Sequence, residues 1–275
     1  MAKDSTKPSS SENLVSETSA LNPNQYTPFK ISEIQRVTHN TSIIRFKIGD
    51  NQVSGMVVPS SVKTMLPPTK EEEPITRKYT IITEEHTKGY MDLIVKEYPE
   101  GIMSKYINSL KVGDELLMKG PIQKSKYVPG SKKEIGMIAG GTGIAPMMQV
   151  IHKVIGNPED TTKIKLLFAN VTENDILLKD ELDRIREEHP EQLEIHYVLD
   201  NPPKGWTGET GYISEEMIKK YMPSPEMGDD CIVYVSGPRG MNELVKGKKI
   251  VEKGELVLGG ILKKLGYTQT NVRKF

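Results

Sequence analysis

The chain of 275 residues contains a single cysteine, Cys231, and no long run of apolar residues. One thiol cannot build a disulfide framework, and it excludes zinc or iron–sulfur sites made from several cysteines. A membrane-spanning helix needs about 20 mostly apolar residues, so none is predicted. The five histidines show no paired metal-ligand spacing such as H-E-x-x-H, and no metal site is expected.

Neither sign of charge is in excess. The 37 Lys and Arg residues balance 37 Asp and Glu residues, so the formal net charge is zero. This balance gives no reason to expect a nucleic-acid partner. Hydrophobic residues make up 36% of the chain, which is enough for a core, and the length suits one large domain or two ordinary ones.

The first 24 residues are rich in Ser, Asn, Pro and charge. They contain no Arg and no apolar stretch of signal-peptide length. Such a composition cannot bury enough apolar surface to fold, so residues 1–24 are predicted to be a disordered tail. No anchor is encoded in this chain, and we expect a monomeric cytoplasmic protein, which could still associate with the face of an intracellular membrane.

The character of the chain changes between residues 25–130 and residues 131–275. The first part has short β-type runs separated by turns, which predict an antiparallel barrel. Its expected strands are 29–38, 41–48, 52–59, 77–83, 90–98 and 114–122, with one helix at 104–110. The stretch 125–133 is interpreted as a linker.

In the second part, strands alternate with amphipathic helices, which predicts a parallel sheet wrapped by helices. The expected strands are 134–140, 163–170, 193–199 and 231–237. The expected helices are 142–155, 175–189, 214–222 and 254–267. The fold class is therefore two domains, an antiparallel β-barrel followed by an α/β parallel-sheet domain.

A glycine-rich turn follows the first strand of the second part. The segment IGMIAGGTGIAP contains Gly140, Gly141, Thr142 and Gly143 and leads directly into a helix. Glycines allow a sharp turn and close approach of a phosphate to backbone amides, and the helix start adds partial positive charge. Pro146 stands where a third glycine is usual, and a tight turn without a ligand remains the alternative.

The residue that would select the nucleotide lies after the second strand of this part. In parallel-sheet dinucleotide folds the ribose is bound there. The segment FANVTENDILL carries Glu173 and Asp175 and no basic residue before Lys179. A carboxylate accepts hydrogen bonds from a ribose 2′-hydroxyl and repels a 2′-phosphate, which favours NADH over NADPH. Asp175 could instead serve only the helix N-terminus, or do both.

Two further motifs lie in the barrel part. RKYT places Arg77 and Tyr79 on one strand face, followed by Thr80, which supplies an anion clamp, a stacking ring and a hydroxyl. Taken alone, this could be an ordinary strand start. Further on, Lys96 and Tyr98 share a strand face.

Beyond them, Gly101 and Ser104 lead into the expected helix at 104–110. This second glycine-to-helix junction could hold another diphosphate. The alternative is an ordinary helix start capped by Ser104.

Together these motifs resemble the ferredoxin-reductase superfamily. The layout is R-x-Y-[ST], then G-x-x-S opening a helix, then GGTG-x-x-P, then a late Gly-Pro turn. Within it the chain is most similar to NADH–cytochrome b5 reductases, over roughly residues 26–275. The resemblance implies FAD and NADH as cofactors, and a cytochrome b5-like haem protein as the acceptor of single electrons.

The resemblance also implies roles for individual residues. Arg77 would meet the FAD phosphates, Tyr79 would stack on the flavin ring, and Thr80 would lie near the flavin N5. Ile94, Lys96 and Tyr98 would line the flavin, and Gly101, Met103 and Ser104 would hold the diphosphate through backbone amides. On the NADH side the implied residues are Gly140, Gly141, Thr142, Gly143, Pro146, Asp175, Ser236, Gly237, Pro238 and Met241. Phe275 would pack near the flavin side of the domain interface. The residues nearest the chemistry would be Thr80, Lys96, Thr142 and Ser236.

The sequence departs from the family pattern at three positions. Lys78 replaces a proline in R-x-Y-[ST], Ile102 replaces a lysine in the turn before the helix, and Ser236 replaces the cysteine of Cys-Gly-Pro. A serine in that place predicts slower hydride transfer but not its loss. Lysines around an exposed flavin edge would favour an acidic acceptor. Lys124, Lys126, Lys132 and Lys133 are candidates, although a solvated linker explains them equally well.

Three alternatives stay open from the sequence. The same fold could serve another acceptor, such as a quinone or a small oxidant. It could also belong to a flavin-binding or regulatory relative without efficient turnover, which Lys78, Ser236 and Arg239 would suit. A different nucleotide-binding parallel-sheet enzyme, such as a methyltransferase, could share the glycine turn but would not explain the barrel and RKYT.

Overall fold

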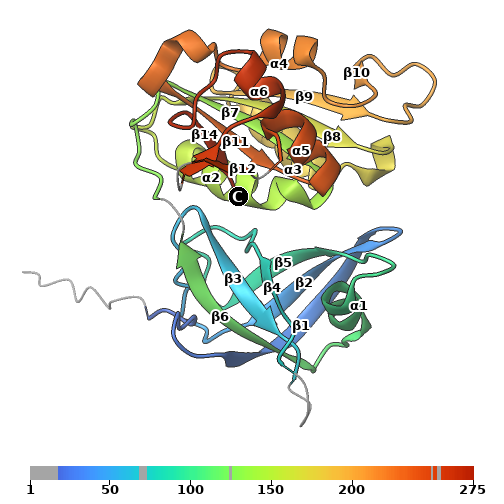
Figure 1. The fold of residues 1–275 in the computed structure, drawn as a ribbon. Coiled ribbons are helices and arrows are strands. Elements are labelled where there is room, and N and C mark those ends of the chain that lie inside the picture. Colours follow the sequence, from blue (N-terminus) through green and yellow to red (C-terminus); the bar gives the residue numbers. More distant parts are fainter. Residues whose placement is uncertain (1–17, 68–72, 124–125, 249, 253–254) are drawn as a thin grey trace, which may run out of the picture.

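A computed structural model of the chain describes residues 18–67, 73–123, 126–248, 250–252 and 255–275. The chain forms two lobes, stacked one above the other in Figure 1. We call residues 18–123 the barrel lobe and residues 126–275 the α/β lobe. The C-terminus lies on the side of the α/β lobe that faces the barrel lobe.

The barrel lobe is a six-stranded antiparallel sheet in the order β4-β3-β6-β1-β2-β5. Alternate side chains point inward, so that Ile44 and Phe46 are fully buried in its core. The elements are β1 (Thr27–Thr38), β2 (Thr41–Lys47), β3 (Ser60–Met65), β4 (Thr76–Tyr79), β5 (Tyr90–Lys96), α1 (Ile102–Ser109) and β6 (Glu115–Gln123).

The strand predicted at residues 52–59 is wrong, because only Val53 in that stretch forms isolated bridges. The strand is β3, which begins at Ser60. The apolar residues that suggested a strand are buried for another reason: Val58 packs into the core of the α/β lobe, and Met56 into the barrel core. Burial by tertiary packing therefore imitated a strand pattern.

The predicted disordered tail is wrong for its described part. Residues 1–17 lie outside the described residues, but Leu21 is buried in the barrel core. The amides of Ala20 and Leu21 donate to the carbonyls of Val53 and Ser54. The polar composition of residues 1–24 gave no indication that Leu21 would attach this segment to the barrel core.

The α/β lobe contains a six-stranded parallel sheet in the order β10-β9-β8-β7-β11-β14. The predicted barrel followed by a parallel sheet is thus confirmed. The strands are β7 (Glu134–Gly140), β8 (Lys163–Asn170), β9 (Leu193–Leu199), β10 (Glu209–Thr210), β11 (Cys231–Ser236) and β14 (Val272–Lys274).

Helices cover both faces of this sheet (Figure 1). They are α2 (Ile144–Ile155), α3 (Lys179–Glu188), α4 (Glu215–Tyr221), α5 (Arg239–Lys246) and α6 (Gly260–Lys264), with short 3₁₀ turns η1 (Gly141–Gly143), η2 (Glu173–Asp175) and η3 (Pro225–Asp230). Among the described residues, no helix has the length and apolar character needed to cross a bilayer.

Two predicted helices differ from the structure. The expected helix at 254–267 is only α6, because the preceding residues form a hairpin of β12 (Ile250–Glu252) and β13 (Glu255–Val257). The apolar run there is compatible with either state until a strand partner decides it. Helix α3 begins at Lys179 and not at Asp175, since Leu178 adopts a left-handed conformation with φ of 57°.

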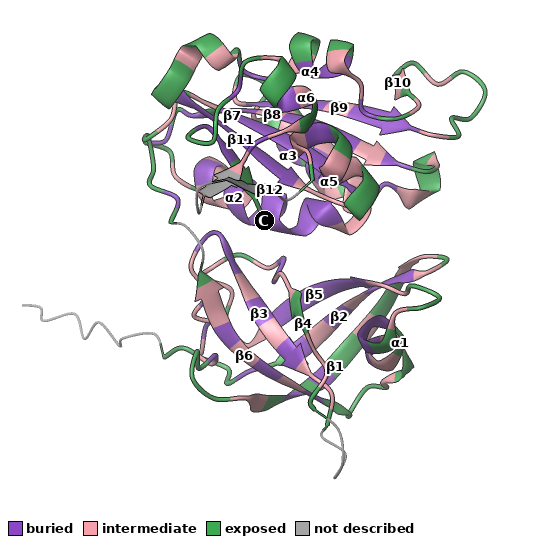
Figure 2. Ribbon diagram, viewed as in Figure 1, coloured by how far each residue is buried: buried purple, intermediate pink, exposed green. Residues whose placement is uncertain are grey.

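The two lobes share one apolar core. Val58, Ile82 and Ile94 of the barrel lobe pack against the buried side chains of α2 and the parallel sheet. The connecting stretch is not a loose linker, because Tyr127 is buried and its hydroxyl donates to Asp160 Oδ2 at 2.6 Å. Figure 2 shows α2 as largely buried between the lobes.

Candidate active site between the two lobes

A cleft of about 620 Å³ opens where the carboxyl ends of the parallel strands face the barrel lobe. It brings together twelve residues that the sequence analysis selected. From the barrel lobe these are Tyr79, Thr80, Ile94, Lys96 and Tyr98; from the α/β lobe they are Thr142, Gly143, Pro146, Ser236, Gly237, Pro238 and Phe275. Ligands of open parallel sheets bind at this end of the strands.

Tyr79 forms an aromatic surface on the barrel side of the cleft. Burial raises the pKa of its phenol to about 12, with a smaller contribution from the nearby Tyr98 phenol and an opposing one from Arg77. The ring is therefore neutral at ordinary pH. Arg77 itself is exposed beside the cleft, and among the described residues its guanidinium donates only to the carbonyl of Thr76. A flat neutral ring beside an available cation suits a ring system that carries phosphate.

The glycine junction before α1 lies next to Tyr98. The Ser104 hydroxyl accepts from the Tyr98 amide at 3.2 Å and donates to the Gly101 carbonyl at 3.1 Å. Ser104 thus braces the turn, and α1 has no side-chain cap. The first amides of α1, including that of Met103, have no intrahelical partner. The Met103 side chain is buried in the barrel core, so only its backbone can meet a ligand.

The glycine turn after β7 has the backbone that a phosphate requires. Gly141 adopts a positive φ of 52°, which other residues rarely reach. Helix α2 then starts at Ile144 without a side-chain cap. The Ile144 amide already donates to the carbonyls of Gly141 and Thr142, so an anion would meet the preceding glycine turn and the positive end of the helix dipole.

A second turn packs directly against the first. A Cβ on Gly143 would collide with the Ser236 carbonyl oxygen, and a Cβ on Gly140 would lie 2.8 Å from the Met241 sulfur. Met241 therefore lies behind the turn, as a support outside the cleft. The β7 and β11 turns form one rigid floor, which only glycine allows.

Three hydroxyl groups line the cleft from opposite sides: those of Thr80, Thr142 and Ser236. No hydrogen bond joins them to another residue in the part of the chain that the structure describes. They are available donors and acceptors.

Asp175 lies outside the cleft, in η2. One carboxylate oxygen accepts from the Thr172 amide at 3.1 Å and from its hydroxyl at 2.7 Å, forming a capping box. The other oxygen lies 3.6 Å from Nδ1 of His39, which belongs to the barrel lobe. The capping role that the sequence left open is therefore present.

The C-terminal residue closes one side of the cleft. Phe275 stacks on Tyr234 with ring centroids 4.7 Å apart, and its amide bonds to the Val235 carbonyl. Sequence reasoning missed its neighbours Arg273 and Lys274, and also Pro59, Ser60, Ser61, Lys78, Ile122 and Ala145. Of these residues, only Arg273, Lys274 and Lys78 could have been selected from the sequence, because they add positive charge to the last residues and to the RKYT motif.

Two of the lysines predicted at the flavin edge are misplaced. Lys132 Nζ donates to the Asp229 carbonyl, and Lys133 forms an ion pair with Asp230 at 2.6 Å. Both precede β7, so they lie at the amino end of the sheet, away from the cleft. Lys124 lies outside the described residues, and Lys126 is exposed.

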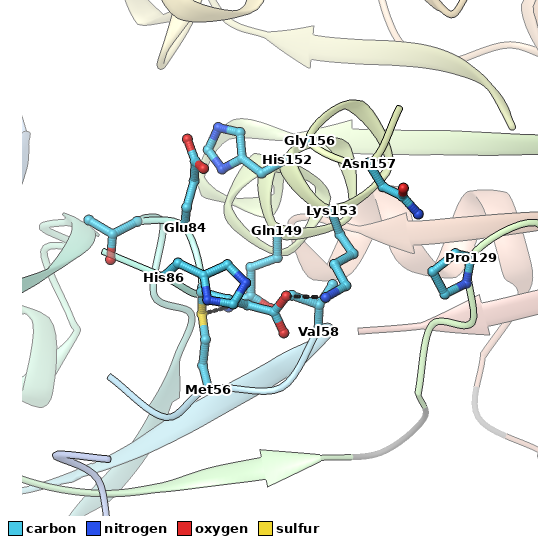
Figure 3. A pocket seen from close by; sticks show the side chains of 12 residues that line it. Met56, Val58, Glu84, His86, Pro129, Gln149, His152, Lys153, Gly156 and Asn157 are labelled. Carbon is cyan, nitrogen blue, oxygen red and sulfur yellow. Dashed lines mark hydrogen bonds and ion pairs between the residues drawn. The ribbon is translucent and has the colours of Figure 1, made fainter. Parts of the chain in front are cut away.

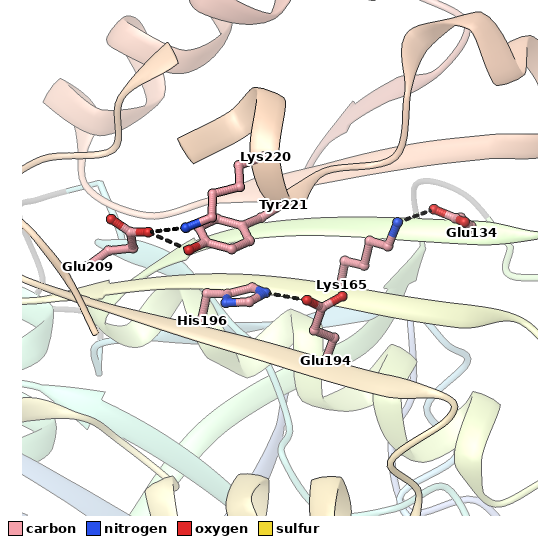
Figure 4. Close-up of polar contacts among 7 residues, drawn as sticks. All are labelled: Glu134, Lys165, Glu194, His196, Glu209, Lys220 and Tyr221. Carbon is pink, nitrogen blue, oxygen red and sulfur yellow. Dashed lines mark hydrogen bonds and ion pairs between the residues drawn. The ribbon is translucent and has the colours of Figure 1, made fainter. Parts of the chain in front are cut away.

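Another cavity, of about 500 Å³, lies along β9 and β10. Its charged groups pair with each other: Glu209 binds both Lys220 and the Tyr221 hydroxyl, and His196 stacks on Tyr221 while contacting Glu194 (Figure 4). With these groups already satisfied, the cavity offers little open chemistry.

The cleft fits the two cofactors that the motifs imply. The barrel side supplies an aromatic ring and the lysines Lys78 and Lys96 in the cleft, and the uncapped start of α1 lies next to Tyr98 at its border. The opposite side supplies a glycine cradle that a Cβ would fill, and a second uncapped helix start. Of the expected phosphate-binding residues, only Gly143 lines the cleft itself, while Arg77, Gly101, Met103, Ser104, Gly140 and Gly141 lie outside its lining. A flavin and a nicotinamide nucleotide that meet in the cleft would extend their diphosphates toward these two helix starts.

Comparisons with known proteins agree with this geometry. Residues 28–127 match the family model described as "Oxidoreductase FAD-binding domain", and residues 137–247 match "Oxidoreductase NAD-binding domain". The chain is 47% identical over 260 residues to an NADH-cytochrome b5 reductase-like protein of Arabidopsis thaliana, covering 93% of the chain and 78% of the relative. It is 43% identical over 251 residues to NADH-cytochrome b5 reductase 2 of Aspergillus clavatus, covering 91% and 77%.

Solved structures of related proteins have the same two-lobe fold. The cytochrome b5 reductase domain of Ulva prolifera nitrate reductase superposes with a TM-score of 0.81 at 32% identity, covering 94% of this chain and all of that domain. The CS-b5R domains of human Ncb5or share the fold, with a TM-score of 0.73 at 21% identity, covering 91% of this chain and 69% of that one.

Proposed function

The chain belongs to the NADH–cytochrome b5 reductase family, and from this premise we propose how its own residues bind FAD and NADH and pass electrons to an acidic haem protein such as cytochrome b5. The observation that carries the proposal is the single cleft in which Tyr79 and Thr80 face Thr142, Gly143 and Ser236.

FAD belongs to the barrel side. Tyr79 supplies the stacking surface, Thr80 a hydroxyl at the reacting edge, and Arg77 a charge for the phosphates. Ile94, Lys96 and Tyr98 complete the lining from the end of β5. The amides that follow Gly101, at Met103 and Ser104, hold the diphosphate at the start of α1.

NADH belongs to the α/β side. Gly140, Gly141 and Gly143 shape the phosphate cradle, and Pro146 is buried in the first turn of α2. Thr142, Ser236, Gly237 and Pro238 border the place where the nicotinamide would lie. Met241 supports this floor from behind, Phe275 borders it, and Asp175 would accept from the adenosine ribose.

The flavin, when bound, accepts hydride from reduced nicotinamide and releases electrons one at a time, which matches a two-electron donor to a haem acceptor. The chain itself contributes position and exclusion of water. Rigid glycine turns fix one partner and β4 and β5 fix the other. The neutral Tyr79 phenol adds no charge beneath the reacting ring.

A surface for the acceptor lies beside the cleft. Lys63 of β3 stands directly opposite Lys78 of β4 and Lys119 of β6 in the sheet register. We call these three residues the lysine row. Like charges placed directly opposite destabilise a sheet, and no ion pair relieves them within the described residues. Lys78 also lines the cleft, so the row leads to the reacting centre. Carboxylates on an incoming haem protein would complement it.

The visible spectrum of the purified protein tests the function. We expect flavin bands that bleach on anaerobic addition of NADH and return when oxidised cytochrome b5 is added. Flavin that binds but does not bleach would support a non-catalytic relative. A protein that cannot be reconstituted with added FAD would overturn the proposal.

A further inference from the structure

Helix α2 buries one polar side chain on its inward face. Gln149 is 1% exposed and lies among the apolar residues of IAPMMQVI. A buried amide without hydrogen bonds would destabilise the fold, so its partners need an explanation.

Within the described residues, every hydrogen-bond partner of the Gln149 side chain belongs to the other lobe. Its Nε2 donates to the Ile81 carbonyl at 2.8 Å, and its Oε1 accepts from the Ser60 amide at 2.9 Å. Nε2 also lies 3.4 Å from the Met56 sulfur. Figure 3 shows the side chain reaching from α2 to Met56, beside a cavity of about 340 Å³ on the seam between the lobes.

These bonds connect the two halves of the proposed active site. Ile81 directly follows Thr80, and Ser60 begins β3 and lines the cleft. On its own side, Gln149 is six residues beyond Gly143, which is about 9 Å along a helix axis. One rigid amide therefore links the segment that faces the flavin to the helix whose start would hold NADH.

The apolar contacts between the lobes do not provide the same control. Burial of apolar surface is favourable but non-directional, so by itself it selects no single distance between two groups. Two hydrogen bonds from one planar amide fix distance and orientation together.

We propose that Gln149 is a positioning residue that sets the separation between nicotinamide and flavin, and hence the rate of hydride transfer. This inference rests on the proposed function. Gln149 touches neither the cleft nor the reacting atoms; it acts through Ile81 and Ser60.

The principal test replaces Gln149 with leucine, which keeps the volume and removes both bonds. Flavin reduction at saturating NADH should slow by roughly 10- to 100-fold, the scale expected for a small misplacement of reacting groups. The isotope effect with NADH deuterated at C4 should rise, while the affinities for FAD and NAD⁺ change little. Amide exchange at Ser60 should become faster even in the absence of both nucleotides.

The matched control is Gln192→Leu. Gln192 Nε2 donates to the Asp160 carbonyl, so the control removes a glutamine-to-backbone bond that lies within the α/β lobe alone. It should leave the rate of flavin reduction and its isotope effect unchanged.

A second variant, Gln149→Glu, covers the case in which the leucine variant fails to fold. A protonated carboxyl can still donate to Ile81 and accept from Ser60, and burial favours that form. The rate relative to wild type should therefore recover as the pH falls. Other ionisable groups line the same cavity, namely Glu84, Glu85, His86, His152 and Lys153, and the wild-type profile measured in parallel corrects for them.

The outcomes separate the two proposals. Wild-type flavin that NADH cannot reduce would defeat the proposed function itself. The inference would be overturned if the wild type is active and Gln149→Leu keeps the same rate of flavin reduction and the same isotope effect while its Ser60 amide exchanges faster. Gln149 would then be only a structural contact. A Gln149→Glu variant whose rate relative to wild type does not vary with pH would do the same.

Discussion

His39 and Asp175 face each other across the seam between the lobes, with the imidazole Nδ1 3.6 Å from the carboxylate oxygen. His39 sits at the tip of the β1–β2 hairpin, and Val37 and Ile43 of the same hairpin pack on the α/β core. Asp175 also caps η2 through Thr172. The carboxylate expected to select the nucleotide is thus held by its own lobe and approached by the other.

Asp175→Asn should narrow the preference for NADH over NADPH by roughly 10-fold, equivalent to about 1.4 kcal/mol. Asparagine keeps an oxygen for the Thr172 cap but removes the charge that would repel a 2′-phosphate. The ratio of kcat/KM values for the two nucleotides measures the effect. Asp180→Asn, at an exposed acid one turn further on, is the control. A native protein that prefers NADPH would contradict the ribose assignment.

Gly143→Ala should abolish most NADH-dependent flavin reduction and destabilise the fold by about 1–3 kcal/mol. The new methyl group would collide with the Ser236 carbonyl, which is backbone and cannot rotate away. Stopped-flow reduction and thermal unfolding together report this change. Gly240→Ala meets nothing within 4 Å and should behave like wild type. Normal reduction by the Gly143 variant would show that the two turns are not a rigid floor.

Ser236→Cys should accelerate flavin reduction by up to about 10-fold, or about 1.4 kcal/mol of barrier. The serine lines the cleft where the resemblance implies a cysteine near the reacting nicotinamide carbon. Pre-steady-state kinetics at saturating NADH isolates this step. If cysteine gives the same rate as serine, the account of that turn must be abandoned.

Replacing Lys63 and Lys119 together by glutamine should lower kcat/KM for cytochrome b5 by roughly 10-fold at low salt and flatten its salt dependence. Reduction of a neutral quinone should not change, because the cleft itself is intact. Lys163→Gln, at an exposed lysine at the amino end of β8, is the control. Equal losses with the quinone and with cytochrome b5 would argue against a docking role.

Tyr79→Ala should weaken FAD binding by roughly 10-fold through loss of the aromatic stack, whereas Tyr79→Phe should bind nearly normally. Because the pKa of Tyr79 is raised to about 12, its contribution to stability is complete below pH 10 and is lost as the pH rises toward 12. The affinity for FAD, measured by flavin fluorescence from pH 6 to 10, should therefore depend on pH in the same way in the wild type and in Tyr79→Phe. A transition in that range that disappears in the phenylalanine variant would refute this assignment.

Much of the local structure follows from the sequence. Strands β7, β8 and β9 have the predicted bounds, because continuous apolar runs between polar turns allow only a buried strand there. The glycine turn before α2 also follows from its composition, since Gly141 needs the left-handed region.

Other features were decided by contacts between distant residues. Met56 and Val58 resembled a strand because the cores bury them, and Leu21 anchored a segment whose composition suggested disorder. Lys132 and Lys133 were candidates for the flavin edge from the sequence, but in the structure they lie at the opposite end of the parallel sheet from the cleft.

The sequence by itself determined the two-lobe order, the two glycine-led helix starts and the residue types that can hold phosphates and an aromatic ring, because these depend on local backbone freedom and apolar spacing. Only the tertiary structure decided that Gln149 would bridge the lobes, that His39 would meet Asp175 and that three lysines would stand in one row. The hydrogen-bond partners of Gln149 are 68 or more residues away in the sequence. Strand register and lobe packing bring all these residues together, and no local sequence pattern encodes either of them.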